Sequence, residues 1–300
     1  MLEKIVGNAA VIQAIQAALS TGRLSHSILL IGEQGTGTGF AARSLAADYL
    51  APNGGAAANR VMKGQSEDCL EVFGEGASGE IKIDRIREIR RNIFSTSLSS
   101  SGRVVIIYQA QHFNSSSANA LLKVLEEPPE GVIFILTASS AAAVLPTIRS
   151  RCIAFSFSPV TNTECVQYLH QQRPECRNAE FLAEVFGGKI GSALACTDDP
   201  IRKSILDDAL RLASFASKGA TYNSMVLLSG REGDKPAAKI LLEDLQGICS
   251  ATLRGCSVSE LSAQQAAYIL PIAQQAHQKL TANVNAKLVF AWMAAKLRQS

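Results

Sequence analysis

The sequence predicts an α/β domain with a largely parallel sheet, followed by a second half made of helices. A short apolar run that ends in glycine, at 27–32, and two fully apolar runs, at 104–107 and 132–136, have the composition of buried strands. Helical patterns separate these runs, as expected where crossover helices join parallel strands. After about residue 158 the strand signals stop, and we therefore predict that the remainder is all helical.

The predicted domain boundaries follow from interruptions in this pattern. We expect the α/β domain at residues 1–158, a small helical domain at 159–203 and an all-α domain at 204–300. Gly187-Gly188 and Asp198-Asp199-Pro200 break the helical periodicity near the second boundary.

Within these domains the apolar spacing predicts individual elements. In the first domain we expect helices at 8–21, about 40–50, 84–94 and from about Ser115, and a loop at 51–59. In the second half we expect helices at 161–171, 177–186, 191–196, 201–217, 222–229, 235–253, 259–279 and 283–298.

Composition limits the classes of function. The 300 residues are 47% hydrophobic and 18% charged, which is typical of a globular protein. The formal net charge of +3 is far below the basic excess of proteins that hold nucleic acid alone, so any DNA contact is expected to be local or shared. No apolar run has the length of a membrane span and the start lacks signal-peptide features, so we expect a cytoplasmic protein. The seven cysteines contain no Cys-x-x-Cys pair and are expected to be reduced thiols.

A glycine-rich loop joins the first predicted strand to the next helix. Its residues, Gly32-Glu33-Gln34-Gly35-Thr36-Gly37-Thr38-Gly39, have the context and glycine spacing of a phosphate-binding P-loop. In a working P-loop the residue at position 38 is a lysine that binds the β- and γ-phosphates, and the residue at 39 carries a hydroxyl that binds Mg²⁺. Thr38 and Gly39 lack both groups, so we predict that this loop hydrolyses no ATP. The alternative is an ordinary glycine-rich turn.

A second catalytic position also lacks its usual residues. In P-loop ATPases an acidic pair normally follows the next apolar strand, where an aspartate positions Mg²⁺ and a glutamate activates water. After the run 104–107 this chain has Tyr108-Gln109, which can neither bind a metal as a carboxylate nor act as a base at neutral pH. We interpret the joint loss as a degenerate site that requires no bound ATP.

Several further motifs occur in one order over about residues 5 to 157. They are Ile5-Val6-Gly7-Asn8, Gly22-Arg23-Leu24-Ser25-His26, Lys63-Gly64-Gln65-Ser66-Glu67-Asp68, Asn119-Ala120-Leu121-Leu122-Lys123-Val124-Leu125-Glu126-Glu127-Pro128-Pro129 and Leu145-Pro146-Thr147-Ile148-Arg149-Ser150-Arg151-Cys152. Together they resemble the clamp-loader subunits of bacterial DNA polymerase III, in the AAA+ superfamily. The resemblance implies an AAA+ P-loop NTPase-like domain at 1–158, a helical lid domain at 159–203 and a helical collar domain for oligomerisation at 204–300.

Within this family the sequence resembles the delta-prime type of subunit, which lacks the P-loop lysine that gamma/tau subunits keep. Gly191 supports this choice, since it stands where the resemblance would place a sensor arginine of the hydrolysing subunits. Family members of this type usually carry four zinc-binding cysteines after the P-loop helix. Only Cys69 lies in that region, and one thiolate cannot form a tetrahedral site, so we expect no zinc or other metal and a short or mobile loop at 51–65.

Arg151 is the candidate catalytic residue. It belongs to the Ser150-Arg151-Cys152 motif, which the resemblance implies supplies an arginine finger in trans to ATP on a neighbouring subunit. Such a guanidinium stabilises the charge on the transferring phosphoryl group. The alternative is a surface arginine that caps a short helix or pairs with a carboxylate, given that Arg149 lies beside it.

Two other candidates are interpreted as structural. Glu126-Glu127 could be an acid/base pair, but adjacent helical residues point in different directions, so we expect a solvated helix end before Pro128-Pro129. Cys152 leads into an expected apolar strand at 153–155 and is expected to pack rather than react.

The resemblance implies a non-hydrolysing subunit that is no enzyme by itself. The subunit would belong to the DNA polymerase III holoenzyme, which is a DNA-directed DNA polymerase. Its expected partners are gamma/tau-type and delta-type subunits and, indirectly, the sliding clamp and primer–template DNA, with no membrane. One alternative is a gamma/tau-like subunit that still binds or hydrolyses ATP through an unconventional site. Another is an independent DNA-binding protein, which the charge balance disfavours.

Overall fold

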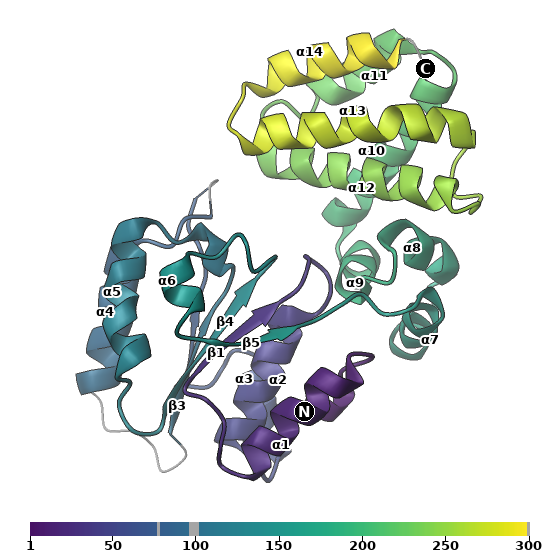
Figure 1. Ribbon diagram of the computed structural model, residues 1–300. Coiled ribbons are helices and arrows are strands. Elements are labelled where there is room, and N and C mark those ends of the chain that lie inside the picture. Colours follow the sequence, from purple (N-terminus) through teal and green to yellow (C-terminus); the bar gives the residue numbers. More distant parts are fainter. Residues whose placement is uncertain (77–78, 96–101, 299–300) are drawn as a thin grey trace. The chain divides into compact units, whose positions relative to one another are not determined.

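The computed structural model describes residues 1–76, 79–95 and 102–298, and its contacts divide the chain into two compact units. The first unit is Met1–Val160 and contains the sheet, and the second is Thr161–Ser300. Figure 1 shows that the second unit consists of helices.

The first unit is built on a five-stranded sheet in the order β2-β3-β4-β1-β5. Every strand pairing is parallel, as the sequence predicts. The strands are β1 (Ser27–Ile31), β2 (Cys69–Val72), β3 (Arg103–Ile107), β4 (Val132–Ala138) and β5 (Ile153–Ser156).

Helices cover both faces of this sheet (Figure 1). Alternate residues of the inner strands enter opposite cores: on β1, Ile28 and Leu30 belong to one cluster and Leu29 to the other. The first cluster includes buried residues of α1, α2 and α3, and the second includes those of α4 and α5. The helical elements of this unit are η1 (Leu2–Lys4), α1 (Ala9–Ser20), α2 (Thr38–Leu50), α3 (Gly55–Met62), α4 (Ile83–Ser95), η2 (Ala110–His112), α5 (Ser115–Glu126) and α6 (Pro146–Arg149).

One local expectation is wrong, and one strand was not predicted. The loop expected at 51–59, and more broadly at 51–65, contains the helix α3, whose Ala58 and Val61 are buried in the same core as α2. Alanine favours helix, and burial of this face adds the stability that a short helix lacks alone. The strand β2 had no counterpart in the prediction, because it has only four residues and pairs with β3 alone at the edge of the sheet.

The second unit confirms the predicted helical half. In the described residues each predicted helical segment coincides with one helix, and no strand follows β5. The helix α10 crosses position 203, where we placed a boundary between two helical domains, and that division stays a prediction. Within the described chain, no helix combines the length and the hydropathy required to span a membrane. The helices are α7 (Asn162–Gln172), α8 (Ala179–Phe186), α9 (Ile190–Asp198), α10 (Pro200–Ser217), α11 (Thr221–Ser229), α12 (Lys235–Leu253), α13 (Ala263–Thr281) and α14 (Ala286–Leu297).

The helix α12 is held tightly within this unit. Its Asp244 is 2% exposed and accepts hydrogen bonds from both terminal nitrogens of Arg202 on α10, at 2.5 and 2.6 Å. Burial raises the pKa of Asp244 to about 6, although Arg202 favours the charged carboxylate. A Cβ at Gly247 would lie 2.5 Å from the carbonyl oxygen of Val185, so the close approach of α8 to α12 requires glycine at this position.

Candidate functional site

The glycine-rich loop lies between the end of β1 and the start of α2. Gly35 and Gly37 have φ angles of 88° and 93°, in the left-handed region that glycine adopts without strain. The helix α2 begins at Thr38, so the backbone N–H groups of its first turn are directed toward the loop. The strand, loop and helix predicted around Gly32–Gly39 are therefore all present.

The structure brings Tyr108 against this loop. Tyr108 follows β3 directly, and a Cβ added to Gly39 would lie 3.4 Å from Cε1 of the Tyr108 ring. Position 39 would carry the Mg²⁺-binding hydroxyl of a working P-loop, and position 108 would carry its aspartate. These two positions, far apart in the sequence, therefore lie side by side, and a side chain at position 39 would be in van der Waals contact with the Tyr108 ring.

Tyr108 belongs to a polar cluster with Arg43 and Glu71. The Arg43 Nε donates to Glu71 Oε1 at 2.6 Å and its Nη2 donates to Oε2 at 2.9 Å, while the Tyr108 hydroxyl donates to Oε1 at 3.0 Å. The Tyr108 ring also stacks on Phe73 with a centroid separation of 4.5 Å. Both carboxylate oxygens of Glu71 are thereby engaged, and α2 is joined to β2 and to the end of β3 by side chains of this chain.

The protonation states of this cluster are fixed by burial and pairing. Burial, with the charge of Glu71, raises the pKa of the Tyr108 phenol, so this hydroxyl stays neutral and donates its proton. The hydrogen bonds that Arg43 donates to the Glu71 carboxylate raise the pKa of Arg43, which stays charged. Tyr108 therefore offers no anionic ligand for a metal at neutral pH.

The backbone of Gln109, the residue after Tyr108, contacts β4. Its φ of 56° places it in the left-handed region, and its N–H donates to the hydroxyl of Thr137 at 3.1 Å. Thr137 is 4% exposed and lies near the end of β4. From the sequence we did not predict that Arg43, Glu71 and Thr137 contact Tyr108 or Gln109. The signal that could have indicated them is a polar residue within or beside an otherwise apolar run.

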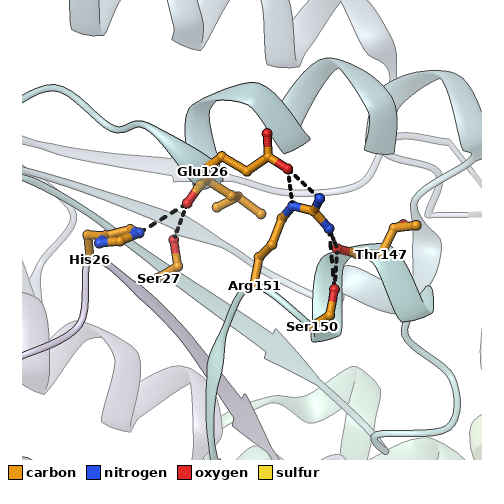
Figure 2. Close-up of polar contacts among 7 residues, drawn as sticks. His26, Ser27, Glu126, Thr147, Ser150 and Arg151 are labelled. Atoms are coloured by element: carbon orange, nitrogen blue, oxygen red, sulfur yellow. Dashed lines mark hydrogen bonds and ion pairs between the residues drawn. The ribbon is translucent and has the colours of Figure 1, made fainter.

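Arg151 lies on the same unit, after α6, and its guanidinium is held by several acceptors (Figure 2). Nε donates to Glu126 Oε1 at 2.6 Å, Nη2 pairs with the same oxygen, and Nη1 donates to the Thr147 carbonyl at 2.8 Å and the Ser150 hydroxyl at 3.3 Å. The side chain is 32% exposed. The alternative interpretation was a surface arginine that caps a short helix or pairs with a carboxylate. Both of these contacts are present.

The remaining candidates show no metal site. Among the described residues, no group of three or more histidine, cysteine, aspartate or glutamate side chains has a geometry for a metal ion. Burial raises the pKa of Cys69 to about 12 and that of Cys152 to about 11, so both thiols are protonated at neutral pH. Cys152 packs against the core of the sheet, in agreement with its structural interpretation.

A parallel sheet with a glycine-rich loop between β1 and α2 defines the class of P-loop NTPase-like domains. Residues 7–161, just over half of the chain, match the model of the family described as DNA polymerase III, delta subunit. The chain belongs to this family of DNA polymerase III subunits.

Curated relatives agree with this assignment, and a solved structure shares the fold. The chain is 31% identical over 175 residues to DNA polymerase III subunit gamma of Buchnera aphidicola subsp. Schizaphis graminum, covering 56% of the chain and 47% of the relative. It is 30% identical over 234 residues to DNA polymerase III subunit tau of Bacillus subtilis, covering 72% and 41%. The chain thus spans less than half the length of these two relatives. The crystal structure of a gamma subunit-related protein from Thermotoga maritima shares the fold, with a TM-score of 0.54, 20% identity and coverage of 95% of this chain and 98% of that one.

The packing of Tyr108 leads to a prediction about restoring the P-loop. We expect the double variant Thr38→Lys/Gly39→Ser to bind no Mg²⁺-ATP, because Tyr108-Gln109 supply no carboxylate for the metal and a side chain at position 39 would contact the Tyr108 ring instead. Adding Tyr108→Asp and Gln109→Glu should produce binding, measured by isothermal titration calorimetry with ATP and Mg²⁺. Equal affinity of the double and the quadruple variants would contradict this role of Tyr108.

Proposed function

We propose that this chain is a non-hydrolysing clamp-loader subunit of the delta-prime type. In this proposal it forms part of the cytoplasmic DNA polymerase III holoenzyme. Arg151 stabilises the charge on the phosphoryl group that is transferred from ATP bound by a neighbouring subunit. The complex loads a sliding clamp on primed DNA. The observation that carries the proposal is the packing of Tyr108 on Gly39, where a working site holds Mg²⁺.

The Arg43–Glu71–Tyr108 cluster supports the loss of hydrolysis. Thr38 and Gly39 supply neither the ammonium nor the hydroxyl of a P-loop, and Tyr108-Gln109 supply no carboxylate. The carboxylate that lies beside Tyr108 is that of Glu71, and its ion pair with Arg43 satisfies it. The domain therefore needs no ATP, Mg²⁺ or zinc to join α2 to the sheet.

The surface position of Arg151 supports action on a neighbour. The resemblance implies gamma/tau-type and delta-type subunits as partners, with contact to the sliding clamp and primer–template DNA made within the assembly. Under this proposal α7 to α9 belong to the lid domain, and most of the later helices form the collar. A subunit with an arginine finger on one side and a degenerate nucleotide site on the other makes two different contacts with its neighbours, as expected in a hetero-oligomeric ring.

The experiment that tests this proposal has two measurements. The purified chain should hydrolyse no ATP by itself, measured as phosphate release with and without primed DNA. It should also co-purify with gamma-type and delta-type subunits expressed together with it. ATP hydrolysis by the chain alone, or a failure to join these subunits, would contradict the proposal.

A gamma/tau-like subunit that binds or hydrolyses ATP through an unconventional site is the second candidate. The names of the relatives favour this second candidate, since the two described above are gamma and tau subunits. Calorimetry of the unmodified chain with Mg²⁺-ATP separates the candidates, because only the second requires binding.

A further inference from the structure

The Arg151 guanidinium has a negative partner on its own subunit. Glu126 Oε1 faces the Nε and Nη2 edge of the guanidinium, which is the edge that binds an anion through two parallel hydrogen bonds (Figure 2). The opposite nitrogen, Nη1, is held by the Thr147 carbonyl and the Ser150 hydroxyl. Every nitrogen of the guanidinium thus has an acceptor, and a phosphate can take the two-pronged edge only if the carboxylate leaves it.

The backbone that carries Glu126 is anchored. Leu125, its neighbour, is buried, and its carbonyl oxygen accepts hydrogen bonds from the Ser27 hydroxyl at 3.4 Å and lies 3.1 Å from His26 Nε2. These contacts fix the end of α5 to the start of β1. The Glu126 side chain itself is 47% exposed, so it can move into solvent while its backbone stays in place.

The end of α5 is an unfavourable place for a carboxylate. Glu126 is the last residue of the helix, where the carbonyl groups carry a partial negative charge. A cation is stabilised there, and the Arg151 guanidinium supplies it. The pair is nevertheless exposed to solvent, and exposed ion pairs contribute little to stability, so the contact is weak enough to open.

We propose that Glu126 is a releasable counter-ion that holds Arg151 against its own subunit until a nucleotide phosphate on a neighbouring subunit replaces the carboxylate. This inference rests on the proposed trans role of Arg151. A nucleoside triphosphate carries more negative charge than one carboxylate, so it is favoured at the guanidinium once the subunits meet. Thr147 and Ser150 keep Nη1 oriented during the exchange.

The first test uses the isolated full-length chain and does not depend on any ATPase. Phenylglyoxal modifies unpaired arginine side chains, and mass spectrometry gives its rate at Arg151. We expect Glu126→Gln to raise this rate roughly two- to fivefold, the range that corresponds to losing an exposed ion pair. Glu127→Gln is the matched control, since Glu127 is adjacent and also exposed and its substitution should leave the rate unchanged.

The second test uses the chain assembled with a gamma-type ATPase subunit. Glu126→Gln should lower the concentration of this chain that gives half-maximal ATPase stimulation, by roughly two- to fivefold, with the maximal rate unchanged. An unchanged phenylglyoxal rate or an unchanged half-maximal concentration in this variant overturns the inference, as does an equal effect of Glu127→Gln. Failure of the proposed function appears separately, as an Arg151→Ala variant that stimulates the ATPase as well as the unmodified chain.

Discussion

Replacing Arg151 with alanine is expected to lower the ATPase rate of a complex of this chain with gamma-type subunits by roughly 10³-fold at the site that Arg151 serves. The guanidinium is proposed to stabilise charge that develops on the transferring phosphoryl group, so its loss should lower the maximal rate more than it weakens assembly. The measurement is steady-state phosphate release from a complex in which the other ATP sites are inactivated. Co-purification of the variant with its partners verifies that the complex still forms.

Two variants sharpen this first prediction. Arg151→Lys keeps the positive charge but not the planar two-pronged donor, so it should restore only a small part of the rate. Arg149→Ala is the matched control, because Arg149 is an exposed arginine at the end of α6, two residues before Arg151, and donates to the Ala141 carbonyl. An equal loss of rate in Arg149→Ala, or full activity of Arg151→Ala, would contradict a specific finger.

The second large effect is expected on stability. Asp244→Ala should lower the free energy of unfolding by about 3–5 kcal/mol, because it leaves the Arg202 guanidinium, 14% exposed, without its partner in the interior. Guanidinium chloride unfolding followed by circular dichroism measures this loss. Glu260→Ala is the control: its partner Lys218 is 62% exposed, and an exposed ion pair contributes little to stability.

A further prediction concerns the whole Arg202–Asp244 ion pair and follows from the raised pKa of Asp244. A pKa of about 6 means that Arg202 does not fully offset the burial of the carboxylate charge. Replacing both partners with apolar residues, as in Arg202→Met/Asp244→Leu, should therefore be much less destabilising than Asp244→Ala alone. A double variant as unstable as the single one would show that the ion pair itself stabilises the fold.

Local sequence determined most of the secondary structure of this protein. The runs 104–107 and 132–136 became β3 and β4, because wholly apolar segments of strand length are stable only when buried on both faces. Helical periodicity likewise predicted α4 and the helices after β5, since it records which face of each helix is buried. The strand β2 and the helix α3 were missed, because a four-residue edge strand and a short alanine-rich segment depend on what packs against them.

From the sequence we also interpreted Thr38, Gly39, Tyr108 and Gln109 as replacements at four catalytic positions and Arg151 as the candidate finger, and these interpretations stay predictions. Only the tertiary structure decided which of these residues meet. Tyr108 lies on Gly39 because strand order places the end of β3 near the start of α2, and Glu126 holds Arg151 across a separation of 25 residues. A sequence pattern records which face of an element is buried, whereas contacts between distant side chains arise only when the elements pack.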